Sequence, residues 1–250
     1  MQNRTEIREC STLDELTECV QLQRDVFALP ETELSPVRHL IVTKNAGGFT
    51  LGAFEGGHLA GFVLSVPAFL RGHRAFYSHM TGVRPEYQSH GIGARLKWAQ
   101  RQRALADGVR YIKWTFEPTK ARNAYFNLEK LGATISEFQE NFYGIDYGTA
   151  PEVAGQKFGL ASDRLFAEWN LESEKVVALA AGEDYIESRA PTANIEIMND
   201  WLSLVAADPE RAKSEQLRIR EEFKTAFCFG MVCRGFYRDD ERPAFLLYKD

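Results

Sequence analysis

Hydrophobic positions alternate or recur at helical spacing along much of the chain, and the first of these patterns predict a strand followed by a helix. Residues 7–10 are predicted to form the strand. Thr12 and Glu15 form a capping box that starts an amphipathic helix ending at Phe27. The side chains expected to supply its buried stripe are Leu13, Leu16, Val20 and Val26.

The next segments predict a helix, a β-hairpin and a further strand. Pro36 is expected at the first position of a helix that ends near Gly47. Residues 49–54 and 59–66 are predicted to pair as a hairpin, because a turn with two glycines separates them. Residues 75–83 form the next predicted strand.

The middle of the chain continues to alternate between helices and strands. A helix is predicted over residues 92–107, a buried strand over 111–116 and a second helix over 121–131. Two further strands are predicted over residues 134–143 and 164–171. The side chains expected to be buried in the first of these helices are Ile92, Leu96, Ala99 and Ala106.

The pattern changes after residue 172. A weak strand over 195–198 and a long polar helix over 209–227 precede two strands, over 231–237 and 244–248. These elements can bury a small core of their own. Three roles are open for the final hairpin: it extends the main sheet, covers a binding pocket or forms a dimer interface, and extra scaffolding is the plainest reading of the tail.

The order of these elements predicts an α/β fold with a mixed sheet. Strands joined by helices are most simply parallel neighbours, whereas the early hairpin must be antiparallel. The turn after residues 75–83 then lies at the C-terminal end of a central strand, where open α/β sheets usually bind ligands.

Composition limits the classes of partner. The chain has 250 residues, 44% of them hydrophobic, and a formal net charge of −5 without a basic block, so nucleic acid is not expected as a partner. No signal peptide or membrane-spanning segment is predicted, and we expect a cytoplasmic protein. The four cysteines, Cys10, Cys19, Cys228 and Cys233, are expected to be buried free thiols, and no metal site is predicted.

A glycine-containing turn between residues 83 and 96 carries the strongest chemical signal. Gly91 and Gly93 leave no side chain between the backbone and an incoming ligand, so the amides from Ser89 to Ala94 can converge on one point. The start of a helix carries unpaired N–H groups and a partial positive charge, which suit a phosphate or pyrophosphate. A tight turn before a helix is the simpler alternative reading of the two glycines.

The flanks of this turn resemble the GCN5-related N-acetyltransferase (GNAT) superfamily. Its acetyl-CoA signature, Gln/Arg-x-x-Gly-x-Gly/Ala, is met by Gln88-Ser89-His90-Gly91-Ile92-Gly93. The segment from Leu128 to Ala133 is similar to the family's Tyr-Glu-Lys-Leu-Gly-Phe segment. More narrowly, Ser78-His79-Met80 and Trp114–Pro118 look like an uncharacterised bacterial subgroup of predicted acetyltransferases.

The resemblance covers about residues 5–172 and implies an acyl-CoA N-acyltransferase fold. In that fold a mixed, mostly antiparallel sheet is splayed at the CoA site, and residues 173–250 would form an α/β extension packed on the domain. The pyrophosphate of acetyl-CoA would rest on the amides of Ser89, His90, Gly91, Ile92, Gly93 and Ala94, beside Gln88. The pantetheine arm would pair with backbone groups near Thr81 and Val83.

Three cationic side chains follow the turn. Arg95, Lys97 and Arg101 are read either as a solvated cationic face or as groups that reach an outer phosphate. Trp114, which alternates with Ile112 and Phe116, is expected in the core.

The chain departs from the family at the position of its general acid. The tyrosine that often protonates the departing thiolate is replaced by Leu128. Tyr125 lies three residues earlier on the same helix and is a substitute candidate, although a packed core aromatic is the alternative. The superfamily asparagine aligns with Ala121, which leaves Asn123 and Asn127 as offset candidates, and Asn123 is the one predicted to bind the cofactor.

Two residues are candidates for the general base. A glutamate found in some family members aligns with Tyr77, and His79 is expected one step along the face shared by positions 77, 79, 81 and 83. Two roles are open for His79. It either acts as the base or a substrate ligand, or it is a buried histidine held by hydrogen bonds. Glu117 ends the adjacent strand and either accepts the amine proton or caps a loop. Tyr143 and Arg164 are weaker candidates for lining an acceptor pocket.

The resemblance therefore implies a cytoplasmic acyl-CoA-dependent N-acyltransferase that transfers acetyl by direct attack of a neutral amine. Acetyl-CoA would be the cosubstrate, and the acceptor would be a small amine or a peptide amine. Two alternatives stay open: a non-catalytic CoA or acyl-CoA sensor, which Leu128 favours, and a nucleotide-phosphate binder, which lacks the Walker and dinucleotide motifs. Acyl length, acceptor and oligomeric state, including a homodimer, are open.

Overall fold

The chain forms two compact units. The computed structural model describes residues 5–27, 29–144, 152–153, 156–157 and 159–249. The first unit comprises Met1–Trp114 and Asn170–Glu172, and the second comprises Thr115–Trp169 and Ser173–Asp250. The predicted division into a domain of residues 5–172 and an extension of residues 173–250 stays a prediction.

The first unit carries most of the predicted N-terminal elements. In chain order these are β1 (Glu6–Glu9), α1 (Leu13–Phe27), a 3₁₀ turn (Glu31–Glu33), α2 (Val37–Asn45), β2 (Phe49–Glu55), β3 (His58–Leu70), β4 (His73–Val83), a second 3₁₀ turn (Pro85–Tyr87), α3 (Ile92–Ala106) and β5 (Tyr111–Phe116), whose last two residues belong to the second unit. The expected positions of these helices and strands are confirmed.

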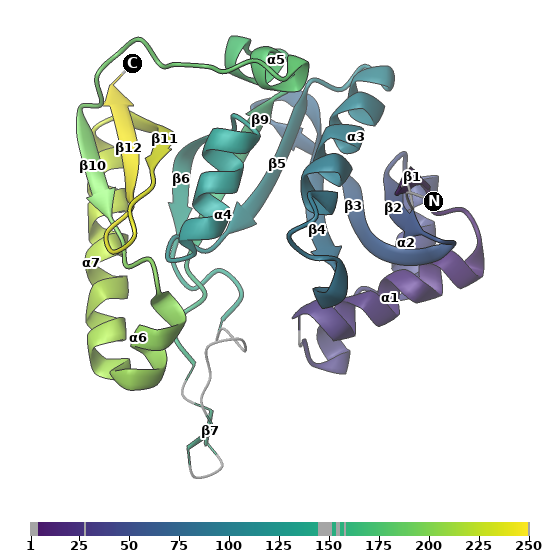
Figure 1. The fold of residues 1–250 in the computed structure, drawn as a ribbon, viewed down its shortest axis with the longest axis horizontal. Helices are drawn as coiled ribbons and strands as arrows, with labels where there is room; N and C mark the ends of the chain where they lie inside the picture. The colour runs from purple at the N-terminus through teal and green to yellow at the C-terminus, as the bar shows by residue number, and fades with distance from the viewer. Residues whose placement is uncertain (1–4, 28, 145–151, 154–155, 158, 250) are drawn as a thin grey trace. The chain divides into compact units, whose positions relative to one another are not determined.

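The strands of the first unit form a mixed and mostly antiparallel sheet, as predicted. They lie in the order β1-β2-β3-β4-β5 (Figure 1). The first three pairings are antiparallel, and only β4 and β5 run parallel. A parallel pair requires a crossover between its strands, and α3 provides it.

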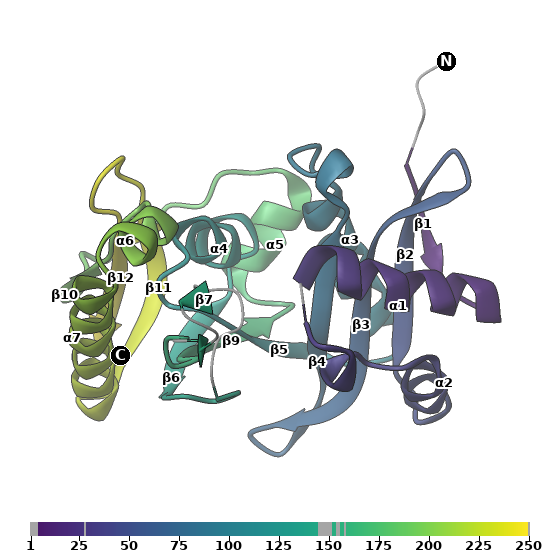
Figure 2. The same cartoon turned by 90° about the horizontal axis from the view of Figure 1, so that it is seen from below.

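The two faces of this sheet are covered by different helices. One face packs on α1 and α2 around a core that includes Leu16, Leu22, Leu40 and Phe62. Figure 2 shows α1 crossing β3 and β4. The helix α3 packs on β2, β3 and β4 from the opposite face.

Details of the helices in this unit differ from the predicted patterns. The capping box is confirmed, since Glu15 N–H donates to Thr12 Oγ1 at 3.2 Å and Thr12 N–H donates to Glu15 Oε2 at 3.1 Å. Leu13 is 65% exposed, because the first turn of α1 extends past the core. Pro36 is the residue before α2 and not its first helical residue.

The second unit contains elements from the middle and the end of the chain. They are α4 (Ala121–Tyr125), a π-helical turn (Phe126–Lys130), β6 (Thr134–Gln139), β7 (Glu152–Val153), β8 (Gln156–Lys157), β9 (Arg164–Asn170), α5 (Glu174–Ala181), β10 (Ala193–Glu196), α6 (Trp201–Ala207), α7 (Pro209–Cys228), β11 (Met231–Tyr237) and β12 (Ala244–Lys249). The short helices α5 and α6 and the pair β7–β8 are additions to the predicted pattern.

The final hairpin extends the sheet of this unit, which was one of its three open roles. Its strands lie in the order β9-β6-β11-β12-β10, with Cys233 of β11 opposite Ile135 of β6. The long helix α7 lies beside β10, β11 and β12 (Figure 1). Phe223 anchors it, packing against Phe138 and Phe245 at centroid distances of 6.0 and 5.0 Å.

The cysteines are free, as expected, but not all are buried. Cys10, Cys19 and Cys233 lie in the core, whereas Cys228 at the end of α7 is exposed. The thiol of Cys19 donates to Cys10 Sγ at 3.8 Å, and burial raises the pKa of Cys233 to about 12.

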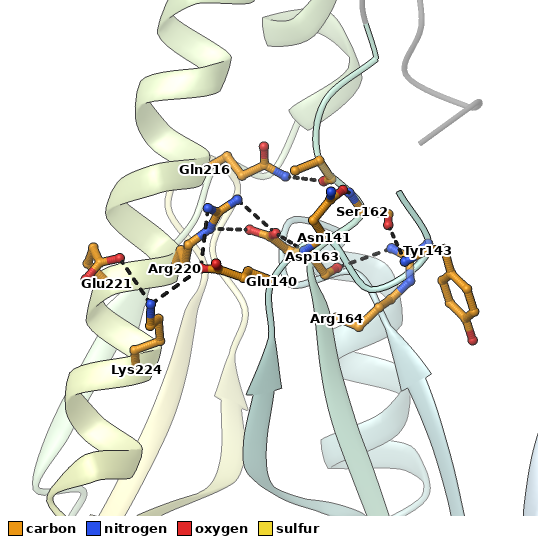
Figure 3. A network of polar contacts seen from close by, with 11 residues as sticks. Glu140, Asn141, Tyr143, Ser162, Asp163, Arg164, Gln216, Arg220, Glu221 and Lys224 are labelled. Carbon is orange, nitrogen blue, oxygen red and sulfur yellow. Dashed lines mark hydrogen bonds and ion pairs between the residues drawn. The ribbon is translucent and has the colours of Figure 1, made fainter. Parts of the chain in front are cut away.

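A polar network joins α7 to the ends of β6 and β9. Asp163, whose side chain is 1% exposed, accepts hydrogen bonds from Arg220 Nε and Nη2 at 3.1 and 3.0 Å (Figure 3). Its Oδ1 also accepts from Asn141 N–H at 3.0 Å. Two hydrogen bonds flank this pair, from Gln216 Nε2 to Ala161 O and from Tyr143 N–H to Ser162 Oγ. The network therefore holds the loop ends against α7.

We expect Arg220→Met to lower the free energy of unfolding by about 3–5 kcal/mol, because it leaves the buried Asp163 carboxylate without its cation. Urea unfolding followed by circular dichroism measures this. Lys224→Met is the matched control, since Lys224 pairs with Glu140 at the surface. A surface ion pair contributes about 1 kcal/mol or less to the free energy of unfolding. Equal losses in the two variants would contradict this account.

Candidate active site

The glycine turn between β4 and α3 forms a backbone cradle. Gly91 precedes the first helical residue and has φ +76°, while Ser89 has φ +65°. The first intrahelical hydrogen bond of α3 is from Arg95 N–H to Gly91 O, at 3.0 Å. The amides of Ile92, Gly93 and Ala94 come before that bond, so the helix itself offers them no acceptor. Together with the partial positive charge of the helix start, they suit an anion.

The space above this cradle is open. A Cβ added at Gly91 meets nothing within 4 Å, and one added at Gly93 meets only Val83 Cγ2, at 3.9 Å. Gly91 is explained by its left-handed backbone, but Gly93 is not, because it lies within α3 and has room for a side chain. Glycine inside a helix costs about 1 kcal/mol relative to alanine. A ligand that approaches the backbone at Gly93 would account for that cost.

The flanking residues of the signature have different environments. The side chain of Gln88 donates from Nε2 to Val83 O at 3.0 Å, which ties the turn to the end of β4. Gln88 thus shapes the cradle through the backbone. His90 is exposed, and the expected contact of its amide with the pyrophosphate stays a prediction.

The strands β4 and β5 separate beside the cradle. Among the described residues, their pairing consists of Phe76 with Ile112 and Tyr77 with Lys113. Both strands continue beyond these pairs, β4 as far as Val83. The sheet is therefore splayed between β4 and β5, as the fold predicted from the resemblance requires.

Backbone groups of Thr81 and Val83 point into this splay. Arg84 N–H donates to Ala60 O of β3 at 2.9 Å, so the backbone of residue 84 faces β3. Backbone groups alternate sides along a strand, which turns those of Thr81 and Val83 away from β3. They are the two positions expected to pair with a pantetheine arm.

A β-bulge at His79 changes the predicted arrangement of β4. Met80 lies opposite Leu64 and Ser78 lies opposite Ser65, so His79 is the extra residue. The expectation that positions 77, 79, 81 and 83 share one face is therefore wrong. Met80 packs in the core under α1 and α2, and His79 points to the same side, whereas Val83 faces α3.

His79 is partly buried against the loop between α1 and α2. Its Nε2 lies 3.2 Å from Ser35 Oγ, and its ring stacks with that of His39 at a centroid distance of 6.3 Å. Gln23 holds Ser35 in place through two hydrogen bonds with its backbone, of 2.8 and 3.1 Å. Burial, and secondly the neighbouring His39, lowers the pKa of His79. A neutral imidazole that can accept a proton is thereby favoured near pH 7.

Of the three cations of α3, Arg95 is exposed, Arg101 is half-buried and Lys97 is buried, so the three do not form one solvated face. Arg95 donates to Thr5 O at 2.6 Å and Arg101 to Leu171 O at 2.9 Å. Lys97 is 3% exposed, and the structure buries it together with Gln100 where Ala99 and Ala106 were expected. The helical spacing of positions 93, 97, 100 and 104 places them on one face and could have indicated that Lys97 and Gln100 are buried. Lysine and glutamine are usually surface residues, so this burial was not predicted.

The remaining candidate residues belong to the second unit. Glu117 lies 3.5 Å from Lys120 and 3.7 Å from Arg164, so two cations engage its carboxylate. Tyr143 is half exposed, and its hydroxyl is 3.4 Å from Thr115 Oγ1. No acceptor pocket around Tyr143 and Arg164 follows from these contacts.

The helix of residues 121–131 is broken into α4 and a π-helical turn. Asn123 is exposed, and Tyr125 is partly buried with Arg238 Cζ 4.7 Å from its ring centroid. Leu128 is fully buried, so the position of the family's acid faces the core. Glu129 accepts from Phe236 N–H at 2.8 Å, which links the family-like segment to β11.

The described residues contain no cluster of three or more histidine, cysteine, aspartate or glutamate side chains suited to a metal ion. Within the same residues, no helix combines the length and hydrophobicity needed to cross a bilayer.

Comparison with known proteins identifies the family of this site. The sequence model of the Acetyltransferase (GNAT) family matches residues 13–133, which include the cradle, β4 and β5. Residues 13–133 belong to the GNAT acetyltransferase family. The resemblance inferred from the signature is confirmed, and the match supports an acyl-CoA-dependent N-acyltransferase activity with acetyl-CoA as cosubstrate.

Solved structures agree with the GNAT fold. An N-acetyltransferase from Staphylococcus aureus Mu50 is 15% identical, with a TM-score of 0.52 over 68% of this chain and 99% of its own. The ribosomal-protein-S18-alanine N-acetyltransferase from Escherichia coli is 15% identical, with a TM-score of 0.50 over 68% and 96%. An aminoglycoside 6'-acetyltransferase type Ii is 16% identical, with a TM-score of 0.51 over 68% and 99%. No curated protein matches the chain in sequence.

We expect Gly93→Val to weaken acetyl-CoA binding at least about tenfold, which is about 1.4 kcal/mol, because the side chain fills the space above the GNAT cradle. The free energy of unfolding should change by no more than about 0.5 kcal/mol, since the site has room and valine is no worse than glycine in a helix. Calorimetric titration and urea unfolding measure the two effects.

Ala106→Val is the matched control, because Ala106 is exposed at the far end of the same helix. It should bind acetyl-CoA as the wild type does. Unchanged affinity in Gly93→Val would show that the cradle does not hold the donor.

Proposed function

We propose that this protein transfers the acetyl group of acetyl-CoA to an amine acceptor by direct attack, with His79 as the general base. The observation that carries the proposal is Gly93, a helical glycine that neither backbone conformation nor packing requires. It lies at the end of β4 next to the splay, where a diphosphate carrying an extended arm fits.

The donor is proposed to lie along the free side of β4. Its pyrophosphate rests on the amides between Ser89 and Ala94, and its pantetheine arm pairs with the backbone of Thr81 and Val83. That orientation directs the thioester from the cradle toward the bulge at His79. Two neighbours whose titles name bound acetyl-CoA, from Elizabethkingia anophelis and Brucella melitensis, have TM-scores of 0.49 and 0.41 and add no support of their own.

The proposed chemistry needs one proton acceptor and one oxyanion site. The neutral amine attacks the thioester carbon, forming a C–N bond and a tetrahedral oxyanion. Backbone amides of β4 within the splay are placed to donate to that oxygen. His79 takes the amine proton, as its lowered pKa and its hydrogen bond to Ser35 permit. The C–S bond then breaks, and CoA leaves as the thiol.

The acceptor is proposed to reach His79 from the face of β4 that α1 and α2 cover. Glu117 is the second candidate base, but its two cationic neighbours give its carboxylate a structural role already. Tyr125 and Asn123 stay candidates for an acid and a cofactor contact. The acceptor class is a small amine or a peptide amine, and neighbours named for a ribosomal protein and an aminoglycoside share the fold alone.

The cellular setting is also part of the proposal. Free thiols at Cys10, Cys19 and Cys233 fit a reducing compartment, and the cytoplasm is proposed. The possible homodimer stays a prediction. Full burial of Leu128 at the acid position favours a second candidate function, a CoA or acyl-CoA sensor without turnover.

Release of CoA thiol from acetyl-CoA in the presence of an amine panel tests the proposal. The panel contains small polyamines, amino acids, aminoglycosides and peptides with a free N-terminus. The proposed enzyme turns over at least one of them, whereas the sensor binds acetyl-CoA and releases no thiol with any.

His79→Gln should lower kcat by about 10²–10⁴-fold, because the amine proton loses its acceptor. On the acidic side, the wild-type kcat should begin to fall only below pH 6.5, since burial lowers the pKa of His79 and protonated imidazole cannot act as a base. The acidic fall should be absent in the variant. His58→Gln is the control, because His58 is an exposed histidine at the start of β3. If His79→Gln keeps wild-type kcat, another group is the base.

A further inference from the structure

Lys97 is a buried amine at the point where β4 and β5 separate. Its Nζ donates to Ser78 Oγ at 3.1 Å and lies 3.8 Å from the centroid of the Trp114 ring. Ser78 and Trp114 are the residues that directly follow the last paired positions, Tyr77 and Lys113. The side chain of Lys97, which extends from α3, therefore bridges β4 and β5 at the apex of the splay, which is the point where the two strands separate.

The surroundings of Lys97 are polar but buried. Gln100 Nε2 donates to Ser78 Oγ at 3.1 Å and to Ser65 Oγ at 2.7 Å, and all three side chains are in the core. From the neighbouring strands, the hydroxyl of Ser78 and the ring of Trp114 face the amine. Burial lowers the pKa of Lys97 to about 7.

Such a side chain is costly to the fold. Moving an ammonium out of water is unfavourable even where a hydroxyl and an aromatic ring lie beside it. A leucine or methionine at this position would fill the same space without that cost. A buried group with a shifted proton affinity in a ligand-binding splay indicates a chemical role.

We propose that Lys97 is the general acid of the transferase, giving its proton to the sulfur of CoA as the thioester bond breaks. This inference rests on the function proposed above. The thioester lies at the apex of the splay if the pantetheine follows β4 back from Val83, and Lys97 is the side chain that occupies this apex. Lys97 thereby supplies the proton that the family's tyrosine gives, which the buried Leu128 at that position cannot give.

The proton balance is complete without a further reactant. The attacking amine forms the C–N bond and loses one proton to His79. When the tetrahedral intermediate collapses, the C–S bond breaks and its electron pair goes to sulfur. Lys97 supplies the proton that converts this thiolate to the thiol and becomes a neutral amine. Solvent returns His79 and Lys97 to their starting states.

The two groups act from opposite faces of β4. His79 points toward α1 and α2, whereas Ser78, which contacts Lys97, points toward α3. The amine would then attack from one face, and the sulfur would depart on the other.

Lys97→Met tests the proposal, because methionine has a similar length and no proton to give. We expect kcat to fall about 10²–10³-fold with the acetyl-CoA dissociation constant within about threefold of wild type. The midpoint of thermal unfolding should be unchanged or higher, since the substitution removes a buried charge. The decline of wild-type kcat as pH rises above about 7, where Lys97 loses its proton, should disappear.

Lys44→Met is the matched control, since Lys44 is a half-exposed lysine on α2 paired with Glu9. It should retain the wild-type kcat and pH profile. A Lys97→Met enzyme with unaltered kcat would overturn the inference while leaving the transferase intact. Lower stability and weaker acetyl-CoA binding in proportion to lost activity would make Lys97 a structural bridge and also overturn it. Wild-type protein that binds acetyl-CoA but acetylates no amine would overturn the proposed function itself.

Discussion

The separation of β4 from β5 is the constraint on which the rest of the site depends. Two parallel strands that part after Tyr77 and Lys113 leave the backbone of Thr81 and Val83 facing an opening. The bulge at His79 coincides with this separation, and a bulge both bends a strand and redirects its side chains. Without it, His79 would face α3 and would lie far from Ser35 and His39. One extra residue in β4 thus orients the candidate base at the point where β4 and β5 separate.

Most of the fold was predictable because its signals are local. The capping box at Thr12 and the glycine turn at Gly91 each act within a few residues, so a short window contains the whole physical cause. The matched signature around Gln88 identified the glycine turn, the candidate donor cradle, for the same reason. The helix α5 escaped prediction because a run of eight residues is too short to show helical periodicity above the noise.

The catalytic candidates were harder to predict because their positions depend on pairing between distant segments. The bulge at His79 exists only relative to Leu64 and Ser65 in β3. Lys97 was read as a surface cation because its burial depends on Ser78 and Trp114, which lie on two different strands. Periodicity identifies which face a residue shares, but it does not reveal that a buried face contains a charged group.

The placement of His79 and Lys97 on opposite faces of one strand resolves a conflict between base and acid. Burial lowers the pKa of Lys97 to about 7 and moves the pKa of His79 below its ordinary value, so in direct contact the two groups would titrate as a coupled pair and compete for one proton. The strand between them keeps the two titrations separate. The imidazole can then stay neutral while the amine carries its proton, which is the combination that acyl transfer requires. A single strand that separates the two groups also aligns them with the thioester, if the donor lies along its free edge as proposed.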